Sequence, residues 1–220
     1  MSSFSNLQVI LNNTGFLLDG LKLSFLLTLV GVSSGIVLGT LLTLARLFEP
    51  NFLGRAVKTY VYFFRAIPLV LVIFWIYFIL PLIVGRPIGA LISVVVAFSL
   101  FEAAYYSEII RSGIASVRAG QFYAGLAVGM SAPQSMVYIV LPQAFRAMIP
   151  VFLTQAIILF QDTSLVFVVS LHDFLTASSV VADRDGNVVT VYVFACLVYY
   201  LISAGLTWIV GRLGKESVRD

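Results

Sequence analysis

The chain has 220 residues, of which 60% are hydrophobic and only 10% are charged, whereas a water-soluble domain is about 45–50% apolar and about 25% charged. A mean hydropathy of +1.05 excludes a single soluble core and indicates that lipid is the surrounding solvent. The small net charge of +3, without a long basic tract, gives no support to a nucleic-acid partner.

Five uncharged or nearly uncharged runs predict an all-α integral membrane protein with five transmembrane helices, forming one transmembrane domain over residues 1–220. In chain order the runs are Leu23–Ala45, Ala66–Val84, a third from Ile88 that is apolar to Phe101, Ala147–Gln161 with an extension back to Leu141, and Val188–Ile209. The fourth is the least clear, because it has only 15 uncharged residues. The "SLVFVVSL" that follows it is too short to cross a bilayer, and is either the end of that span or a re-entrant piece.

The basic residues predict the orientation, because loops on the cytoplasmic side carry the excess of Lys and Arg. Ten basic residues fall on one side of the five spans: Arg46, Arg55, Lys58, Arg65, Arg111, Arg118, Arg146, Arg212, Lys215 and Arg219. Only Lys22, Arg86 and Arg184 fall on the other, together with Asp162, Asp173, Asp183 and Asp185. We therefore expect the C-terminus in the cytoplasm and the N-terminus outside.

One motif that resembles a catalytic site is better explained by packing, and the cysteine and histidine content argues against a metal or redox site. "GVSSG" fits the G-x-S-x-G pattern of hydrolases, but Gly31, Gly35 and Gly39 recur every four residues inside a membrane span, which predicts a small-residue packing face. The chain has one cysteine, Cys196, and one histidine, His172. We therefore expect no metal site, no redox site and no catalytic triad.

The third span carries an acidic side chain, Glu102, toward its cytoplasmic end. A carboxylate at that depth must pair, face a wet cavity or be protonated. Arg65, at the start of the second span, is a candidate partner in a gating ion pair. The alternative is structural: the helix projects into the cytoplasm, and Glu108 and Arg111 form an ordinary surface pair.

The cytoplasmic connection between the third and fourth spans contains an uncharged stretch, Gly120–Phe145. Its "QFYAGLAV" predicts a short helix that displays Phe122, Tyr123 and Leu126. Gly129 is expected to cap that helix and Pro133 to stop it. An apolar helix in such a place is either a docking site for another protein or a piece packed against its own membrane helices.

This stretch resembles the cytoplasmic loop of ABC-importer permeases, whose pattern is E-A-A, three residues, Gly, nine residues and I-x-L-P. Here Tyr123-Ala124-Gly125 is followed at that spacing by Gly129 and by Ile139–Pro142, and Gly120-Gln121 precede it as in polar amino-acid permeases. Tyrosine replaces the glutamate and Gly125 replaces the second alanine. The resemblance implies a coupling loop over residues 117–142, in which Gly120, Gln121, Phe122, Tyr123, Ala124, Gly125, Leu126 and Gly129 dock an ATPase.

The resemblance covers nearly the whole chain, through "FRAIPLVLVIFWIY", "FEAAYYSEIIRSGI", "LPQAFRAMIP" and "FQDTSLV". It is strongest to the glutamate/aspartate branch of the polar amino-acid permeases. It implies a type I ABC-importer permease fold in a bacterial inner membrane and a core of two permeases, identical or different. It also implies two cytoplasmic ATPases, which hold ATP and Mg²⁺, and an external binding protein. This chain has no P-loop signature to bind ATP itself, so we expect no cofactor on it and no enzymatic activity.

The end of the fourth span, Gln161, Asp162, Thr163 and Ser164, is a candidate part of the substrate path, because polar groups at membrane depth suit a cavity. Helix capping by the last three is the alternative. A carried acidic amino acid also needs a compensating cation, for which Arg65, Arg86 and Arg184 are candidates. An ion-gradient-driven secondary transporter is the competing function, although its usual inverted repeats are not evident in this sequence.

Overall fold

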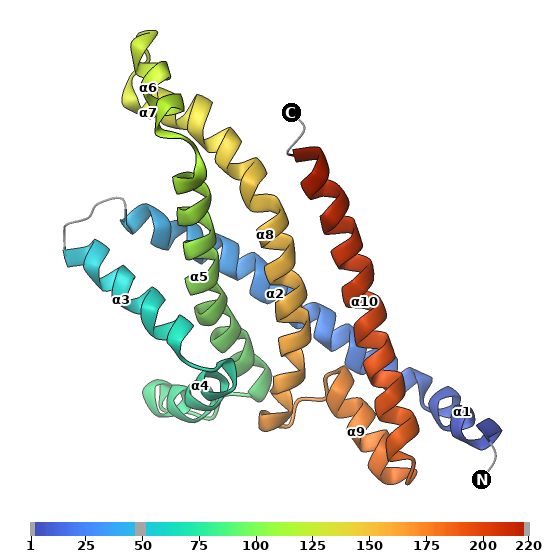
Figure 1. Cartoon of the computed structure of the whole chain (residues 1–220). Helices are drawn as coiled ribbons and strands as arrows, with labels where there is room; N and C mark the ends of the chain where they lie inside the picture. The colour runs from blue at the N-terminus through green and yellow to red at the C-terminus, as the bar shows by residue number, and fades with distance from the viewer. Residues whose placement is uncertain (1–2, 47–51, 218–220) are drawn as a thin grey trace.

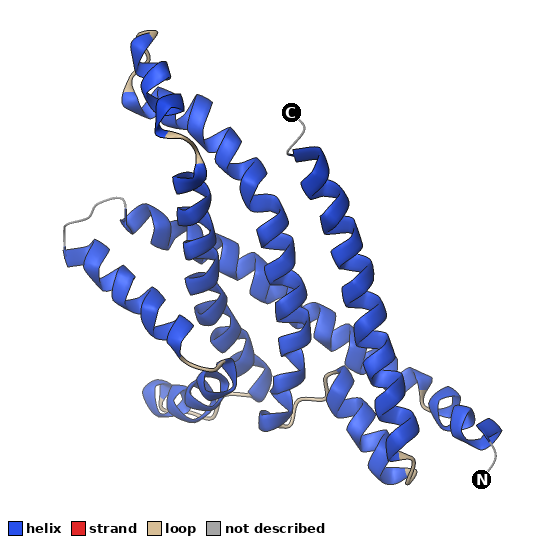
Figure 2. Ribbon diagram, viewed as in Figure 1, coloured by secondary structure: helices blue, strands red, loops and turns tan. Residues whose placement is uncertain are grey.

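The computed structural model describes residues 3–46 and 52–217, and every regular element among them is helical (Figure 2). In chain order these are α1 (Ser3–Asn12), α2 (Thr14–Arg46), α3 (Phe52–Ala66), α4 (Leu69–Val84), α5 (Ala90–Ser116), α6 (Ala119–Ala127), α7 (Ala132–Ser135), the π-helix η1 (Met136–Val140), α8 (Leu141–Asp162), the 3₁₀-helix η2 (Thr163–Val169), α9 (Phe174–Arg184) and α10 (Val188–Ser217). The prediction of an all-α membrane protein is confirmed.

Four segments are long and apolar enough to cross a membrane: Thr14–Arg46, Ala90–Ser116, Ala132–Val169 and Val188–Arg212. The third of them runs continuously through η2, so "SLVFVVSL" belongs to the end of the fourth predicted span. A fifth span is counted only if the bent pair α3 and α4 is taken as one. The described residues therefore hold four or five candidate spans.

The second predicted span, Ala66–Val84, begins too early: α3 ends at Ala66 and the helix α4 runs from Leu69 to Val84. The chain leaves the helical conformation at Ile67 and Pro68, and α3 and α4 meet at an angle of 111°. Pro68 has no N–H to donate, and a proline disfavours the helical conformation of the residue before it. The sequence signal for this break was the proline itself, inside an otherwise apolar run.

Helix α2 crosses the bundle obliquely (Figure 1). Its 33 residues are about 50 Å long at about 1.5 Å per residue, well beyond the roughly 30 Å of a bilayer's hydrocarbon core. Gly31, Gly35 and Gly39 lie buried along it, and a methyl group at Gly35 would stand 2.7 Å from Cβ of Glu102. The predicted packing face is confirmed, because these glycines let α5 approach the backbone of α2.

The core is built around α5, the most buried of the candidate spans. One cluster joins α2, α4, α5, α8 and η2 through residues that include Leu27, Ile73, Phe98, Leu159 and Val166. Helix α10 is peripheral, with only 6% of its most apolar window buried, and Tyr200 and Leu201 on it are 66% and 65% exposed. Apolar surface of this extent is stable in lipid rather than in water.

The bundle has two distinct ends (Figure 1). Helices α6 and α7 project beyond α5 and α8 at one end, and the last turns of α10 point toward that same end. Helices α1, α4 and α9 lie toward the opposite end. The segment with the docking pattern therefore protrudes at one end of the bundle.

Candidate functional site: coupling segment and cationic pocket

The coupling segment, residues 117–142, is helical rather than a loop. Helix α6 ends in a Schellman motif: the N–H of Met130 donates to the carbonyl of Gly125 (3.1 Å) and that of Gly129 to the carbonyl of Leu126 (3.0 Å). Gly129 is left-handed at φ 87°, as the sequence predicted. Pro133 instead lies in the first turn of α7, between Ser131 and Gln134 of the capping box; its assignment as a helix stop was wrong, because proline is tolerated in the first turn of a helix.

Gly125 is the buried residue of α6. Oγ of Ser135 donates to the carbonyl of Phe122 (2.8 Å), which ties α7 to α6. A side chain at position 125 would meet Cβ of Ser135 at 2.9 Å and Cδ1 of Ile139 at 2.8 Å. Gly125, where the family pattern has alanine, is thus explained by the close approach of α7 and η1 to α6.

The outer face of α6 is apolar and exposed. Tyr123 is 64% exposed, Leu126 36% and Val128, directly after the helix, 76%, while Phe122 is half-buried and packs edge-to-face on Tyr123. Gly120, Gln121 and Ala124 are exposed as well. The sequence left two alternatives for this helix, docking to another protein or packing on the chain's own helices. Packing explains the burial of Gly125 and the partial burial of Phe122, but it leaves the face that carries Tyr123 uncovered.

The π-helix η1 connects this segment to α8. Pro142 follows it, in the first turn of α8, and it cannot donate a backbone hydrogen bond. A single π turn is a common way to accommodate such a break. Along the chain, α5 leads into α6, and η1 leads directly into α8, so this segment connects the two membrane-length helices α5 and α8.

Glu102 is fully buried between α5 and α8, where its carboxylate accepts hydrogen bonds from Nε2 of Gln155 (3.1 and 3.2 Å). Arg65 lies over the ring of Tyr105, 5.5 Å from its centre. The described structure therefore pairs Glu102 with Gln155 and not with Arg65. Sequence reasoning missed Gln155, an amide within an apolar run, because helix register alone does not show which helices face each other.

The expected surface pair at the end of α5 is present. Nε of Arg111 donates to Oε1 of Glu108 (3.0 Å), and Nη1 of Arg46 donates to Oε2 of Glu108 (3.0 Å). Glu108 thus joins the last turn of α2 to α5.

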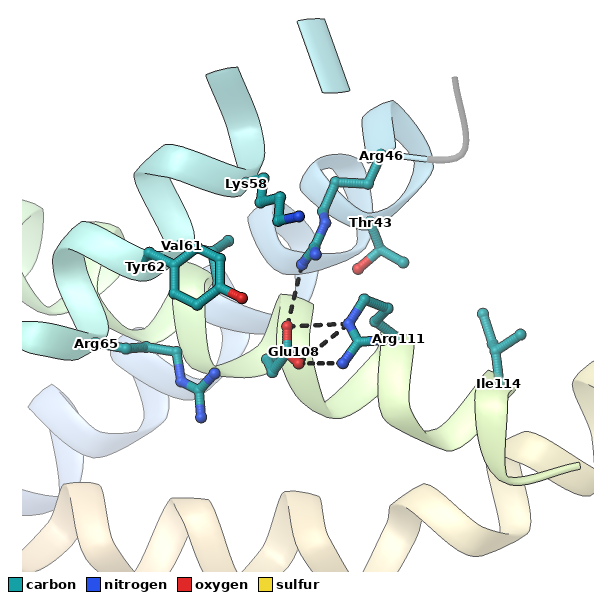
Figure 3. Close-up of a pocket in the computed structure, with 9 residues that line it drawn as sticks. All are labelled: Thr43, Arg46, Lys58, Val61, Tyr62, Arg65, Glu108, Arg111 and Ile114. Carbon is teal, nitrogen blue, oxygen red and sulfur yellow. Dashed lines mark hydrogen bonds and ion pairs between the residues drawn. The ribbon is translucent and has the colours of Figure 1, made fainter. Parts of the chain in front are cut away.

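These groups line a cavity of about 460 Å³, called here the cationic pocket. Its lining residues come from α2, α3 and α5: Thr43, Arg46, Lys58, Val61, Tyr62, Arg65, Glu108, Arg111 and Ile114. Figure 3 shows Arg46, Lys58 and Arg111 gathered around Glu108, with Arg65 at the edge of the group. Four cations face one carboxylate, so the pocket favours an anion.

The four residues proposed for the substrate path differ in exposure and in their hydrogen-bond partners. Gln161 is exposed and donates to Oγ of Ser203 (3.1 Å), while Thr163 is buried and donates to the carbonyl of Phe160 (2.7 Å). Asp162 and Ser164 are half-buried. Asp162 makes no side-chain capping bond, so the capping alternative fails for it, because the chain continues from α8 directly into η2.

The all-helical bundle of membrane-length helices, with a short capped helix projecting from one end, matches the type I ABC-importer permease fold of solved transporters. A solved structure described as an amino acid ABC transporter with histidines superposes with a TM-score of 0.89 at 22% identity, over 94% of this chain and 96% of that one. Such low identity shows the fold alone.

The sequence comparisons identify the family. Residues 35–217 match the model of the binding-protein-dependent transport system inner membrane component, and the chain belongs to that family. It is 48% identical to the glutamate/aspartate import permease protein GltK of Escherichia coli, over 92% of this chain and 93% of that protein. It is 35% identical to the arginine transport system permease protein ArtQ of Bacillus subtilis, over 88% and 89%. The chain is therefore a multi-pass translocation subunit, and ATP hydrolysis belongs to a separate subunit.

Proposed function

We propose that this chain is the permease subunit of an ATP-driven importer of acidic amino acids, glutamate and aspartate. The observation that carries this proposal is the 48% identity to a glutamate/aspartate import permease along nearly the whole chain. The cationic pocket supports it, because a path for dicarboxylates needs compensating positive charge.

The topology has five spans, with α3 and α4 forming the second as a broken helix. The N-terminal end of α2 faces outside, and the coupling segment and the end of α10 face the cytoplasm of a bacterial inner membrane. The ten-to-three distribution of basic residues in the sequence supports this orientation. The two ends of the bundle agree with it, since α6 and the end of α10 lie toward the same side (Figure 1).

The coupling is mechanical. The exposed Tyr123 and Leu126 face of α6 seats in an ATPase subunit, and closure of two ATPases around ATP and Mg²⁺ moves α6. The movement passes into α5 and α8, whose contact through Glu102 and Gln155 serves as the gate between outside and inside access. Substrate is delivered by an external binding protein to a pair of permeases. It passes the junction of α8 and η2, where Asp162 is available for its ammonium group.

The test is transport by the reconstituted complex. Purified permease is placed in liposomes with its ATPase, partner permease and binding protein, and uptake of labelled glutamate is measured with and without internal ATP. We expect uptake only with ATP. Uptake that follows a sodium or proton gradient and ignores ATP would instead establish the secondary-transporter alternative.

A further inference from the structure

We infer that the cationic pocket binds the carboxylates of an acidic amino acid on the cytoplasmic side of the permease, with Lys58 and Arg65 selecting its charge. The inference deepens the proposed function and rests on it. It assigns a second binding region, at the inner ends of α2, α3 and α5, in addition to the α8–η2 junction.

The charge of the pocket is unbalanced. Arg46, Lys58, Arg65 and Arg111 supply four positive charges and Glu108 one negative charge, a difference of +3. Glu108 already accepts from both Arg46 and Arg111. Among residues 3–46 and 52–217, neither Lys58 nor Arg65 forms an ion pair. Clustered cations repel one another, so an anion between them is stabilised by the whole group.

The size and place of the pocket suit a substrate leaving the membrane. Its volume of about 460 Å³ falls within the range of about 300–1,000 Å³ typical of small-molecule sites. Ile114, in the last turn of α5, lines its end toward the coupling segment. At the other edge Arg65 lies over Tyr105, which is three residues along α5 from the buried Glu102. On α5 the lining of the pocket thus runs from Glu108 to Ile114, between the buried Glu102 and the end of the helix.

The structure also distinguishes Arg65 from the other two candidate cations. Arg184 is occupied: its Nε donates to Oδ1 of Asp185 (2.9 Å), and its Nη2 donates to Oδ1 of Asn13. Arg86 lines a separate surface hollow with Tyr77, Phe78 and Leu82, formed by α4 and the turn after it. Of the three candidates, Arg65 is the one that lines a described cavity together with other cations, Arg46, Lys58 and Arg111.

A zwitterionic dicarboxylate matches the pocket better than a phospholipid headgroup does. Its two carboxylates have Lys58 and Arg65 as partners, and its ammonium group has Glu108. The lining is mainly polar and charged, with Val61 and Ile114 as its aliphatic members, so it offers little surface for acyl chains. A bound lipid headgroup is therefore an outcome that the experiment must detect.

The experiment measures equilibrium binding of labelled L-glutamate to the assembled permease–ATPase complex, without ATP and without the binding protein, in nanodiscs of zwitterionic lipid. Lys58→Gln and Arg65→Gln are compared with Arg55→Gln, an exposed arginine on the same helix that does not line the pocket. We expect each pocket variant to raise the Kd about tenfold, as the loss of one charge-assisted contact does. Arg55→Gln should leave the Kd unchanged, and L-glutamine should compete poorly.

Four results would overturn the inference: no glutamate binding to the wild-type complex, equal binding by the pocket variants, equal competition by glutamine, or displacement of glutamate by phosphatidylglycerol added to the nanodiscs. Basal ATPase activity of each variant shows that its complex is assembled. If Arg65→Gln does not fold, Lys58→Gln, a change at an exposed residue, still tests the inference. ATP-driven uptake by the same wild-type complex separates the two proposals. If the complex takes up glutamate but the pocket variants bind it as the wild type does, the inference about the pocket is wrong and the proposed function stands. If the complex takes up no glutamate, the proposed function itself is wrong.

Discussion

Gln155 of α8 donates hydrogen bonds from Nε2 to both carboxylate oxygens of Glu102 on α5, at 3.1 and 3.2 Å. Both side chains are buried, Glu102 completely and Gln155 to 8% exposure. A buried carboxylate is costly unless it is hydrogen-bonded. The pair therefore stabilises the contact between the two helices that lead into and out of the coupling segment.

Replacing Gln155 by leucine should leave the Glu102 carboxylate without its amide partner. We expect a loss of about 1–3 kcal/mol of stability, the cost of an unsatisfied buried polar group, seen as a lower thermal midpoint in detergent. The double variant Glu102→Leu with Gln155→Leu should recover part of that loss, because both polar partners are then gone. Simple additivity of the two single changes would show that the hydrogen bonds contribute nothing.

Gly125→Val should impair coupling, since an added side chain meets Ser135 and Ile139 at 2.8–2.9 Å. Overpacking of this kind costs about 1–3 kcal/mol, enough to displace α6 from α7. We expect ATP-dependent glutamate uptake, measured per inserted permease, to fall about tenfold or more. Gly205→Val on α10 is the control, because nothing lies within 4 Å of a side chain placed there and Gly205 is outside the predicted docking surface. Equal uptake by the two variants would contradict the packing explanation.

A cysteine at position 123 should crosslink to the ATPase subunit. Tyr123 is 64% exposed on the protruding helix, and aromatic side chains of this kind are favoured anchors at interfaces. The experiment uses a Cys196→Ser background, because the native cysteine is exposed. Val189→Cys, 76% exposed at the start of α10, is the control at the other end of the bundle. An ATPase adduct from position 189, with none from 123, would reverse the proposed orientation.

Acid should weaken the contact between the start of α2 and the turn that precedes α10. The hydrogen bond from Arg184 lowers the pKa of Asp185, and Nδ2 of Asn13 also donates to this carboxylate (2.9 Å). A folded-state pKa below the unfolded value gives stability that is present above about pH 4 and is lost as the pH falls through the folded pKa. Since the pair is exposed, we expect a small effect. The thermal midpoint of Asp185→Asn should fall less between neutral and acid pH than that of the wild type, and parallel curves would contradict this assignment.

Much of this protein could be predicted from its sequence. Composition alone required a membrane protein, because 60% hydrophobic residues cannot be hidden in a core of this size. The spacing around Gly129 predicted the capped helix in the coupling segment, because a left-handed C-cap is a local property of the backbone. The glycine repeat of α2 likewise predicted a packing face, which the structure places against α5.

Other features depended on contacts between distant segments. The break between α3 and α4 was missed because a membrane span is predicted from a continuous apolar run, and a single proline does not interrupt such a run. The partner of Glu102 could not be derived, since Gln155 lies 53 residues away and only the packing of α5 on α8 brings the two together. Among the three candidate cations, charge patterning gave no reason to prefer Arg65 over Arg86 or Arg184.

The sequence by itself determined that lipid surrounds the protein, how many apolar runs it has and where the short capped helix forms. These features follow from hydropathy and backbone preferences, which act over a few neighbouring residues. Only the tertiary structure decided which buried groups meet, which glycines are needed for close approach, and which basic side chains share one cavity. Those outcomes depend on how the helices pack. Packing brings together residues that are far apart in the sequence, and nothing in the local sequence around either residue indicates that the two will meet.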